Sequence, residues 1–195
     1  MQAYSLVDPK LVLALKTGAV GALPTDTIYG LVCSASNQQA ASRLYGLSGR
    51  SMPGTIIAAN TQQLVELGLR ARYLKAVEQY WPGPLSVVIP CGYELSYLHL
   101  GKNSLAVRVP ADSAIVKLLA QTGPLLTTSA ARSGESPARS VAEARTYFAE
   151  AVDFYVDGGS MTGRLPSTVI RVVDDAIEIL RKGAVKIDES GKISP

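Results

Sequence analysis

Apolar and polar positions alternate along the chain in a pattern that predicts strands and helices in turn. Short apolar runs bounded by Gly, Pro or Asn are typical of buried strands. The expected strands are Ala19–Leu23, Thr55–Ala59, Leu85–Ile89, Leu105–Val109, Leu125–Thr128, Thr168–Val173 and Ile177–Leu180. Because helical segments separate most of these runs, the pattern predicts an α/β fold: a twisted mixed sheet with helices on its faces.

Residues that cap helices mark where the helical segments begin. The side chains of Asp, Asn and Ser accept hydrogen bonds from the first free N–H groups of a helix. The expected helices run from Asp8 to Lys16, from Asn37 to Leu47, from Asn60 onward, from Ala71 to Tyr80, from Asp112 to Ala120 and from Ser140 to Phe148. We find no repeat and no linker, so we expect one domain over residues 1–195 with a core at about 8–187. Glu189–Pro195 is expected to be frayed.

The composition sets broad limits on the class of protein. The chain has 195 residues, of which 47% are hydrophobic and 18% are charged. Such a chain can bury a substantial core and is not expected to carry long disordered arms. The net charge of +3 is compatible with a protein that handles phosphates or RNA, and many ordinary enzymes share it.

The residues that usually bind metals are few and far apart. Cys33 and Cys91 have no zinc-type spacing, and His99 is the single histidine, so we expect no metal site built from side chains. We expect His99 to be a surface or half-buried residue rather than a catalyst. Asp8 and Lys10 interrupt any signal peptide, and no apolar run reaches ~20 residues. The expected location is therefore the cytoplasm, with no membrane partner.

Hydroxyl and guanidinium groups gather where the apolar strands end. Thr25–Thr27 follows the first expected strand, Thr127–Ser129 closes another, and Arg108 lies inside an apolar strand. Strand ends are where ligands usually bind in open α/β sheets. Hydroxyls and an arginine fork suit phosphate and carboxylate oxygens, so together these residues indicate an anion-binding cavity.

Each of these signals has a simpler alternative. Thr25–Thr27 could be a turn that caps itself, Arg108 could reach the surface or pair with a structural carboxylate, and Ser48–Arg50 could be a plain helix exit. No phosphate-binding or dinucleotide glycine motif is present, and a serine–histidine triad would depend on His99 alone. The remaining chemistry is the binding and positioning of anions.

Six segments resemble, in order, the motifs of the YrdC-like family, which includes YciO-type paralogues. They are Pro24–Leu31, Trp81–Leu85, Ser104–Pro110, Thr127–Ala130, Pro166–Ile170 and Ile179–Gly183. The match extends over almost the whole domain, and six motifs in order are highly specific. The chain is identified as a member of this family, which implies a YrdC-like fold with an anion-binding cavity.

The resemblance implies an enzyme, L-threonylcarbamoyladenylate synthase. This nucleotidyltransferase condenses L-threonine, bicarbonate and ATP with release of pyrophosphate, and a downstream threonylcarbamoyl-transferase modifies adenosine in tRNA. Mg²⁺ is expected to arrive with ATP rather than in a protein cage, and any RNA binding is expected to be weak and salt-sensitive.

By position, the resemblance implies roles for eight residues. Arg50 and Ser129 are the expected catalytic residues. The implied threonine-binding residues are Thr27, Arg108, Thr127 and Ser167, and the implied nucleotide-binding residues are Arg50, Ser104, Ser129 and Arg181.

Two positions depart from the family pattern. Ser48 stands where the family usually has lysine, Ala131 where it usually has asparagine, and the loop after Arg50 is about two residues shorter. Losing one charge-assisted and one neutral contact costs about two to three decades in rate unless another group such as Lys102 or Lys182 compensates. Two alternatives therefore stay open: a synthase with a rearranged anion site, or a non-synthase paralogue that binds nucleotide or RNA.

Overall fold

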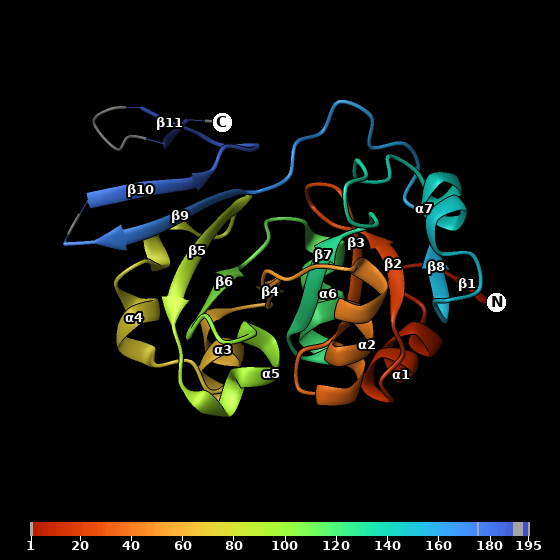
Figure 1. The fold of residues 1–195 in the computed structure, drawn as a ribbon, viewed down its shortest axis with the longest axis horizontal. Coiled ribbons are helices and arrows are strands. Elements are labelled where there is room, and N and C mark those ends of the chain that lie inside the picture. Colours follow the sequence, from red (N-terminus) through yellow and green to blue (C-terminus); the bar gives the residue numbers. More distant parts are fainter. Residues whose placement is uncertain (1, 175, 189–192, 195) are drawn as a thin grey trace.

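The computed structural model describes residues 2–174, 176–188 and 193–194. These residues form a ten-stranded sheet in the order β1-β8-β2-β3-β7-β4-β6-β5-β9-β10 (Figure 1). The strands are β1 (Gln2–Tyr4), β2 (Gly21–Pro24), β3 (Tyr29–Ser34), β4 (Thr55–Ile57), β5 (Leu85–Pro90), β6 (Ser104–Arg108), β7 (Leu125–Ser129), β8 (Phe154–Val156), β9 (Thr168–Val173) and β10 (Ala176–Arg181). Parallel and antiparallel pairs both occur, so the expected mixed sheet is confirmed.

The helices begin where the capping residues predict. The side chains of Asp8, Asn37, Asn60, Asp112 and Ser140 each accept a hydrogen bond from a backbone N–H in the first turn. The helices are α1 (Pro9–Lys16), α2 (Gln38–Ser48), α3 (Thr61–Leu67), α4 (Ala71–Lys75), α5 (Ser96–His99), α6 (Ser113–Thr122) and α7 (Val141–Phe148), with short 3₁₀ turns η1 (Glu78–Tyr80) and η2 (Tyr93–Leu95).

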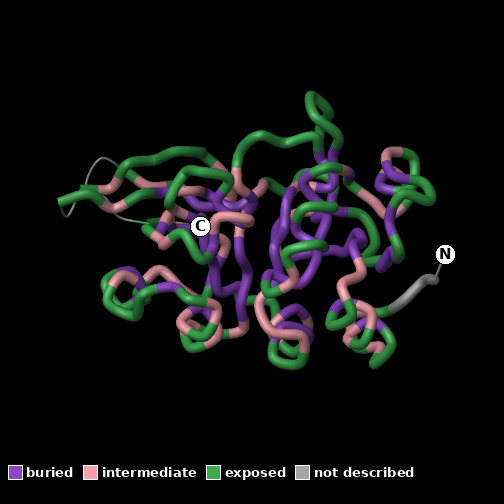
Figure 2. The backbone as a smooth tube through the Cα atoms, turned by 60° about the horizontal axis from the view of Figure 1, so that its bottom comes forward, coloured by how far each residue is buried: buried purple, intermediate pink, exposed green. Residues whose placement is uncertain are grey.

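The central strands of the sheet are buried, as the purple tube in Figure 2 shows, whereas β10 at one edge is largely exposed. One core packs Leu11 and Leu15 of α1 and Ile115 of α6 against one face. The other core is larger and includes residues of α2 and α5. Successive residues of β3 enter different cores, Leu31 the larger and Val32 the smaller, because side chains alternate across a strand.

Three strands of the ten-stranded sheet were not predicted from the pattern: β1, β3 and β8. β3 lies at the centre of the sheet, and all six of its residues are buried. Its sequence begins inside the Pro24–Leu31 motif, and only Leu31, Val32 and Cys33 follow one another as apolar residues. A run of three is too short for sequence periodicity to separate a strand from a loop.

The expected helix Ala71–Tyr80 is divided. α4 ends at Lys75, and Val77 has φ −124° and ψ 3°, outside the helical region. The Val77 N–H donates to Leu74 O at 3.2 Å, three residues back, which tightens the last turn. This rotation buries the Val77 side chain, which is 4% exposed, in the larger core.

The expectation for His99 is wrong in its burial: the side chain is 1% exposed. Its Nδ1 accepts hydrogen bonds from the N–H groups of Gly101 (3.1 Å) and Asn103 (3.2 Å). Both donors belong to the tight turn that leads into β6, so the ring is buried because it satisfies backbone groups there.

The expected frayed C-terminus falls largely on residues 189–192 and 195, which lie outside the described residues. Ile193–Ser194 forms β12 and pairs antiparallel with β11 (Lys186–Ile187), so fraying does not extend to these two residues. Backbone pairing with β11 gives them a fixed register.

Candidate active site

A cavity of about 480 Å³, including its open mouth, lies where six segments converge. They are the turn between β2 and β3, the loop after α2, the ends of β6 and β7, the residues before β9, and the end of β10. The connection from β8 to β9 runs along the upper edge of the sheet in Figure 1 and brings Pro166 and Ser167 to the cavity. Its lining consists of Thr25, Thr27, Ile28, Gly30, Arg50, Pro53, Gly54, Thr55, Arg108, Thr127, Thr128, Ser129, Pro166, Ser167 and Arg181.

The structure brings seven of the eight candidate residues to this one cavity, namely Thr27, Arg50, Arg108, Thr127, Ser129, Ser167 and Arg181. Ser104 is not among the lining residues. It begins β6, four residues before Arg108, and its hydroxyl donates to Lys102 O at 3.4 Å.

The turn between β2 and β3 holds two hydroxyls against the cavity. Thr25 Oγ1 donates to Ile28 O (2.7 Å) and accepts from the N–H groups of Thr27 (3.2 Å) and Ile28 (3.3 Å). Thr25 Oγ1 and Thr27 Oγ1 lie 3.0 Å apart. The segment is thus both a self-capped turn and part of the cavity wall, so the two readings of this motif are compatible.

Arg108 lies at the bottom of the cavity, and its side chain is 3% exposed. Its Nη2 is 3.0 Å from Asp26 Oδ1, and its Nη1 donates to Thr27 Oγ1 at 3.4 Å. Burial lowers the pKa of Arg108, with the charge of Asp26 opposing the shift. Burial likewise raises the pKa of Asp26, with the charge of Arg108 opposing. The guanidinium is therefore buried and paired, and it does not reach the surface.

Asp26 was not among the candidate site residues. Two features of the sequence together could have identified Asp26. It is an acidic residue inside a hydroxyl-rich turn, and Arg108 is a lone arginine in an apolar strand. A buried arginine needs an anionic partner, and Asp26 supplies it.

Arg181 approaches the cavity from β10 and is fixed by Ser167. Its Nε and Nη2 donate to Ser167 O (3.1 and 2.8 Å), and Nη2 also donates to Ser167 Oγ (3.0 Å). Ser167 Oγ lies 2.9 Å from Ser86 Oγ on β5. Burial lowers the pKa of Arg181, and the charges of Arg108 and Arg50 add to that shift. Three guanidinium groups that repel one another face one cavity, which therefore favours an anion.

Two glycines keep the cavity open. A Cβ on Gly30 would collide with Thr127 Oγ1, and a Cβ on Gly54 would lie 2.6 Å from Thr127 O. Both positions therefore require glycine for close approach of the backbone to β7. Gly30 and Gly54 were not candidates from the sequence, although Gly30 belongs to the first motif.

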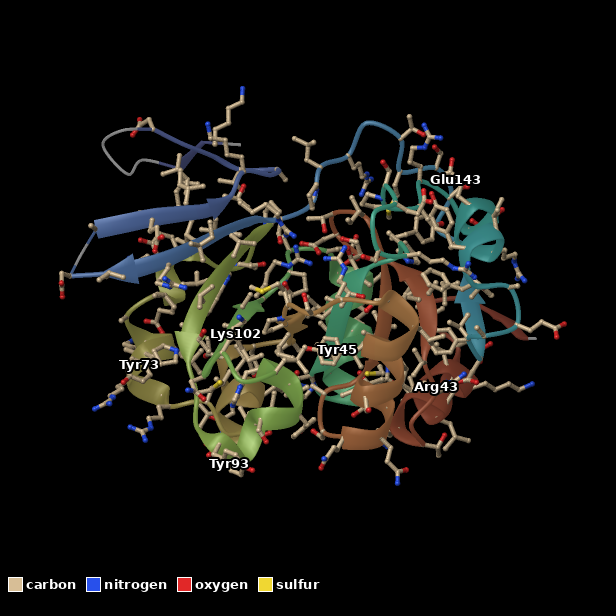
Figure 3. All side chains as sticks on the ribbon, in the orientation of Figure 1. Arg43, Tyr45, Tyr73, Tyr93, Lys102 and Glu143 are labelled. Carbon is tan, nitrogen blue, oxygen red and sulfur yellow. The ribbon has the colours of Figure 1, made fainter. Side chains whose placement is uncertain are left out.

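The two positions that depart from the family pattern lie in the interior. Ser48 is fully buried, and its hydroxyl donates to Tyr45 O at 3.2 Å. Ala131 is 1% exposed. Tyr45, labelled on α2 in Figure 3, donates from its hydroxyl to Leu98 O (2.7 Å) and accepts from Gly54 N–H (3.1 Å). That hydroxyl fixes the short loop after Arg50.

Neither lysine considered as a substitute reaches the cavity lining. Lys102, labelled in Figure 3, belongs to the turn before β6, and Lys182 lines a separate pocket with Lys186 beside β10 and β11. Within residues 2–174, 176–188 and 193–194, no group of three or more His, Cys, Asp or Glu side chains could hold a metal ion. In that same part of the chain, no helix has the length and apolarity needed to cross a bilayer.

The fold and the cavity define an α/β protein with an anion-binding site where strand ends and connecting loops meet. The family model Sua5/YciO/YrdC, described as telomere recombination, matches residues 13–183, and the chain belongs to this family.

Relatives with known names and structures agree with this assignment. A threonylcarbamoyl-AMP synthase of Halorhodospira halophila (strain DSM 244 / SL1) is 39% identical over 150 residues, 74% of this chain and 78% of the relative. The solved structure of P. abyssi Sua5 complexed with L-threonine has a TM-score of 0.82 and 28% identity. It covers 93% of this chain, and this chain spans 55% of that protein. E. coli YciO has the same fold, with a TM-score of 0.76 and 23% identity over 89% of this chain and 87% of YciO.

Proposed function

We propose that this protein is an L-threonylcarbamoyladenylate synthase that acts in the cytoplasm and supplies threonylcarbamoyl groups for adenosine in tRNA. The observation that carries the proposal is the cavity itself, in which three arginines and several hydroxyls face one space without a competing lining carboxylate. The synthase named among the relatives, and the L-threonine complex of Sua5, support the same substrate class.

Threonine is assigned to the buried side of the cavity. Arg108 offers a guanidinium fork to the carboxylate of threonine. The hydroxyls of Thr27, Thr127 and Ser167 line the same cavity. An arginine fork binds a carboxylate with charge-assisted hydrogen bonds, which are stronger when water is excluded. The hydroxyls can donate or accept, so they suit both the side-chain hydroxyl and the amino group of threonine.

The nucleotide is assigned to the more open side of the cavity. Arg50 and Arg181 are both exposed, and both line the cavity together with Ser129 at the end of β7. Ser104 lies outside this lining, so we assign the phosphates to Arg50, Arg181 and Ser129. Mg²⁺ belongs to the ATP substrate in this proposal, where it neutralises phosphate charge.

The proposed reaction needs positioning more than acid–base chemistry. Threonine and bicarbonate first condense to the carbamate with loss of water. A carbamate oxygen then attacks the α-phosphorus, an O–P bond forms, and the bond to the β-phosphate oxygen breaks as pyrophosphate leaves. Arg50 and Ser129 are the residues that we assign to stabilising charge on the phosphate oxygens, while the buried floor keeps water from the labile carbamate.

A second candidate is a non-synthase paralogue that binds nucleotide or RNA. It is favoured by Ser48 and Ala131, which replace the lysine and asparagine of the family pattern and lie buried outside the cavity lining. The retained arginines and hydroxyls favour the synthase because they include a carboxylate site as well as a phosphate site. A downstream transferase remains the expected partner for the product.

Product analysis tests the proposal. The protein is incubated with MgATP, L-threonine and ¹³C-bicarbonate, and the products are analysed by mass spectrometry. We expect threonylcarbamoyladenylate that carries one ¹³C. Binding of ATP without any such product would favour the nucleotide-binding paralogue, and a product from a different amino acid would correct the substrate.

A further inference from the structure

Asp26 and Arg108 form a buried ion pair beneath the cavity, and the stability of the fold does not account for its presence. The two side chains are 7% and 3% exposed, and the joining atoms lie 3.0 Å apart. Both oxygens of Asp26 and the Nε of Arg108 have no hydrogen-bond partner within the described residues. Buried polar groups are almost always satisfied, so the unsatisfied Nε of Arg108, a residue that lines the cavity, points to a missing partner such as a ligand.

Desolvation is the main effect on both members of this pair. Burial raises the pKa of Asp26 and lowers the pKa of Arg108, so in each residue desolvation outweighs the attraction of the partner. Buried ion pairs commonly behave in this way and are poor sources of stability. Groups that are destabilised in this manner inside a cavity are candidates for function.

The contacts of Arg108 show what the pair can do. An arginine has five N–H donors, and this one uses Nη2 toward Asp26 and Nη1 toward Thr27 Oγ1. Both contacts come from the same two-residue segment of the β2–β3 turn, so they fix the guanidinium in the floor of the cavity. The donors that remain are free for a ligand. Asp26 itself is not part of the cavity lining and acts only through Arg108.

We propose that Asp26 is a positioning residue that holds the Arg108 guanidinium in the orientation that receives the carboxylate of the amino-acid substrate. This inference rests on the proposed function for the identity of that substrate. It assigns Asp26 to the amino-acid side of the cavity and predicts little influence on the nucleotide side, where Arg50 and Arg181 lie.

The test compares Asp26→Asn with the wild-type protein by calorimetry. The substitution keeps the shape of the side chain and removes its charge. We expect the Kd for L-threonine to rise about tenfold or more, as for loss of a well-placed charge-assisted contact, while the Kd for ATP changes less than about twofold. The unfolding midpoint is measured as well, because removing one partner of a buried pair leaves Arg108 as an uncompensated charge.

Asp153→Asn is the matched control. Asp153 also pairs with an arginine, Arg43, but both side chains are 41% exposed and lie outside the cavity lining. This variant should leave both dissociation constants unchanged. The proposal is overturned if Asp26→Asn binds L-threonine as tightly as the wild type or more tightly, or if both dissociation constants rise together with a lower unfolding midpoint.

If Asp26→Asn does not fold, a pH titration of threonine binding by the intact protein tests the positioning role of Asp26. The charged groups that act on Asp26 are Arg108 on β6, Asp112 before α6 and Arg164 in the connection to β9. As the pH falls through the raised pKa of Asp26, the carboxylate becomes neutral and threonine affinity should fall. Protonation of Asp26 itself favours the folded state because its pKa is raised, whereas Asp153, whose pKa is lowered by Arg43, loses its stabilising contribution as the pH falls. Constant affinity across this titration overturns the proposal.

The two proposals can fail separately. Absence of threonine binding by the wild-type protein contradicts the proposed function. In that case the Nε–H signal of Arg108 in ¹⁵N relaxation measurements still tests the positioning role, because the pair exists without ligand. Asp26→Asn should make that N–H more mobile, and unchanged mobility overturns the role of Asp26.

Discussion

The floor of the cavity (Asp26, Thr27, Arg108 and Ser167) differs from the corner beside it (Ser48–Gly54 and Ser129–Ala131) in how its polar groups are held. In the floor, the side chains are buried, and the Arg108 guanidinium contacts both Asp26 and Thr27. In the corner, the two positions that depart from the family pattern are small and buried, and the guanidinium of Arg50 is exposed.

This difference separates two kinds of recognition. The floor is preorganised, since its side chains are fixed before a ligand arrives, and preorganised groups bind without a large loss of conformational entropy. The corner has its loop fixed by Tyr45 but presents a single cation to solvent. The floor therefore accounts for a selective carboxylate site, and the corner for a weaker phosphate site.

The largest expected effect comes from the floor. Arg108→Met removes the buried guanidinium but keeps an unbranched side chain of similar length. Loss of a charge-assisted contact costs roughly 1.5–3 kcal/mol, so the Kd for L-threonine should rise about 10- to 150-fold in calorimetry. Equal losses for threonine and ATP would show that the two sides of the cavity are not independent. Arg171→Met is the control, because Arg171 pairs with Glu178 on the exposed β9–β10 hairpin.

A smaller effect is expected at the corner. Arg50→Ala should raise the Kd for ATP by up to about tenfold and leave threonine binding unchanged, because Arg50 is exposed and its charge is screened by solvent. The salt dependence of ATP binding should weaken in the same variant. If ATP affinity does not change, Arg50 is not part of the nucleotide site.

The smallest effect is expected when Ala131 and Ser48 are changed to the residues of the family pattern. Ala131→Asn restores the side chain of the family pattern on a turn whose neighbours are retained, and one neutral hydrogen bond is worth about 1 kcal/mol. Pyrophosphate release should therefore rise by up to about fivefold. Ser48→Lys should gain less and cost about 1–3 kcal/mol of stability, because it adds three side-chain heavy atoms to a fully buried position. Slower turnover in both variants would show that this chain has its own solution to the anion site.

The sequence predicted the sheet, the helix starts and most of the cavity lining because these depend on local signals. A capping side chain acts within its own first turn, and a hydroxyl-rich strand end is visible in a few residues. The pairing of Asp26 with Arg108 joins residues 82 positions apart, and the burial of Ser48 depends on how α2 packs against α5 through Tyr45 and Leu98. No local pattern contains such contacts, which arise only when the sheet is assembled.

The most direct measurement for the account is pyrophosphate release from ATP by the intact protein, with L-threonine and bicarbonate each omitted in turn. If the floor binds the amino acid and the corner binds phosphate, pyrophosphate should be released only when L-threonine and bicarbonate are both present. Release should fall with Arg108→Met even when ATP saturates the protein. Release that continues without threonine, or that does not respond to Arg108→Met, would contradict the account.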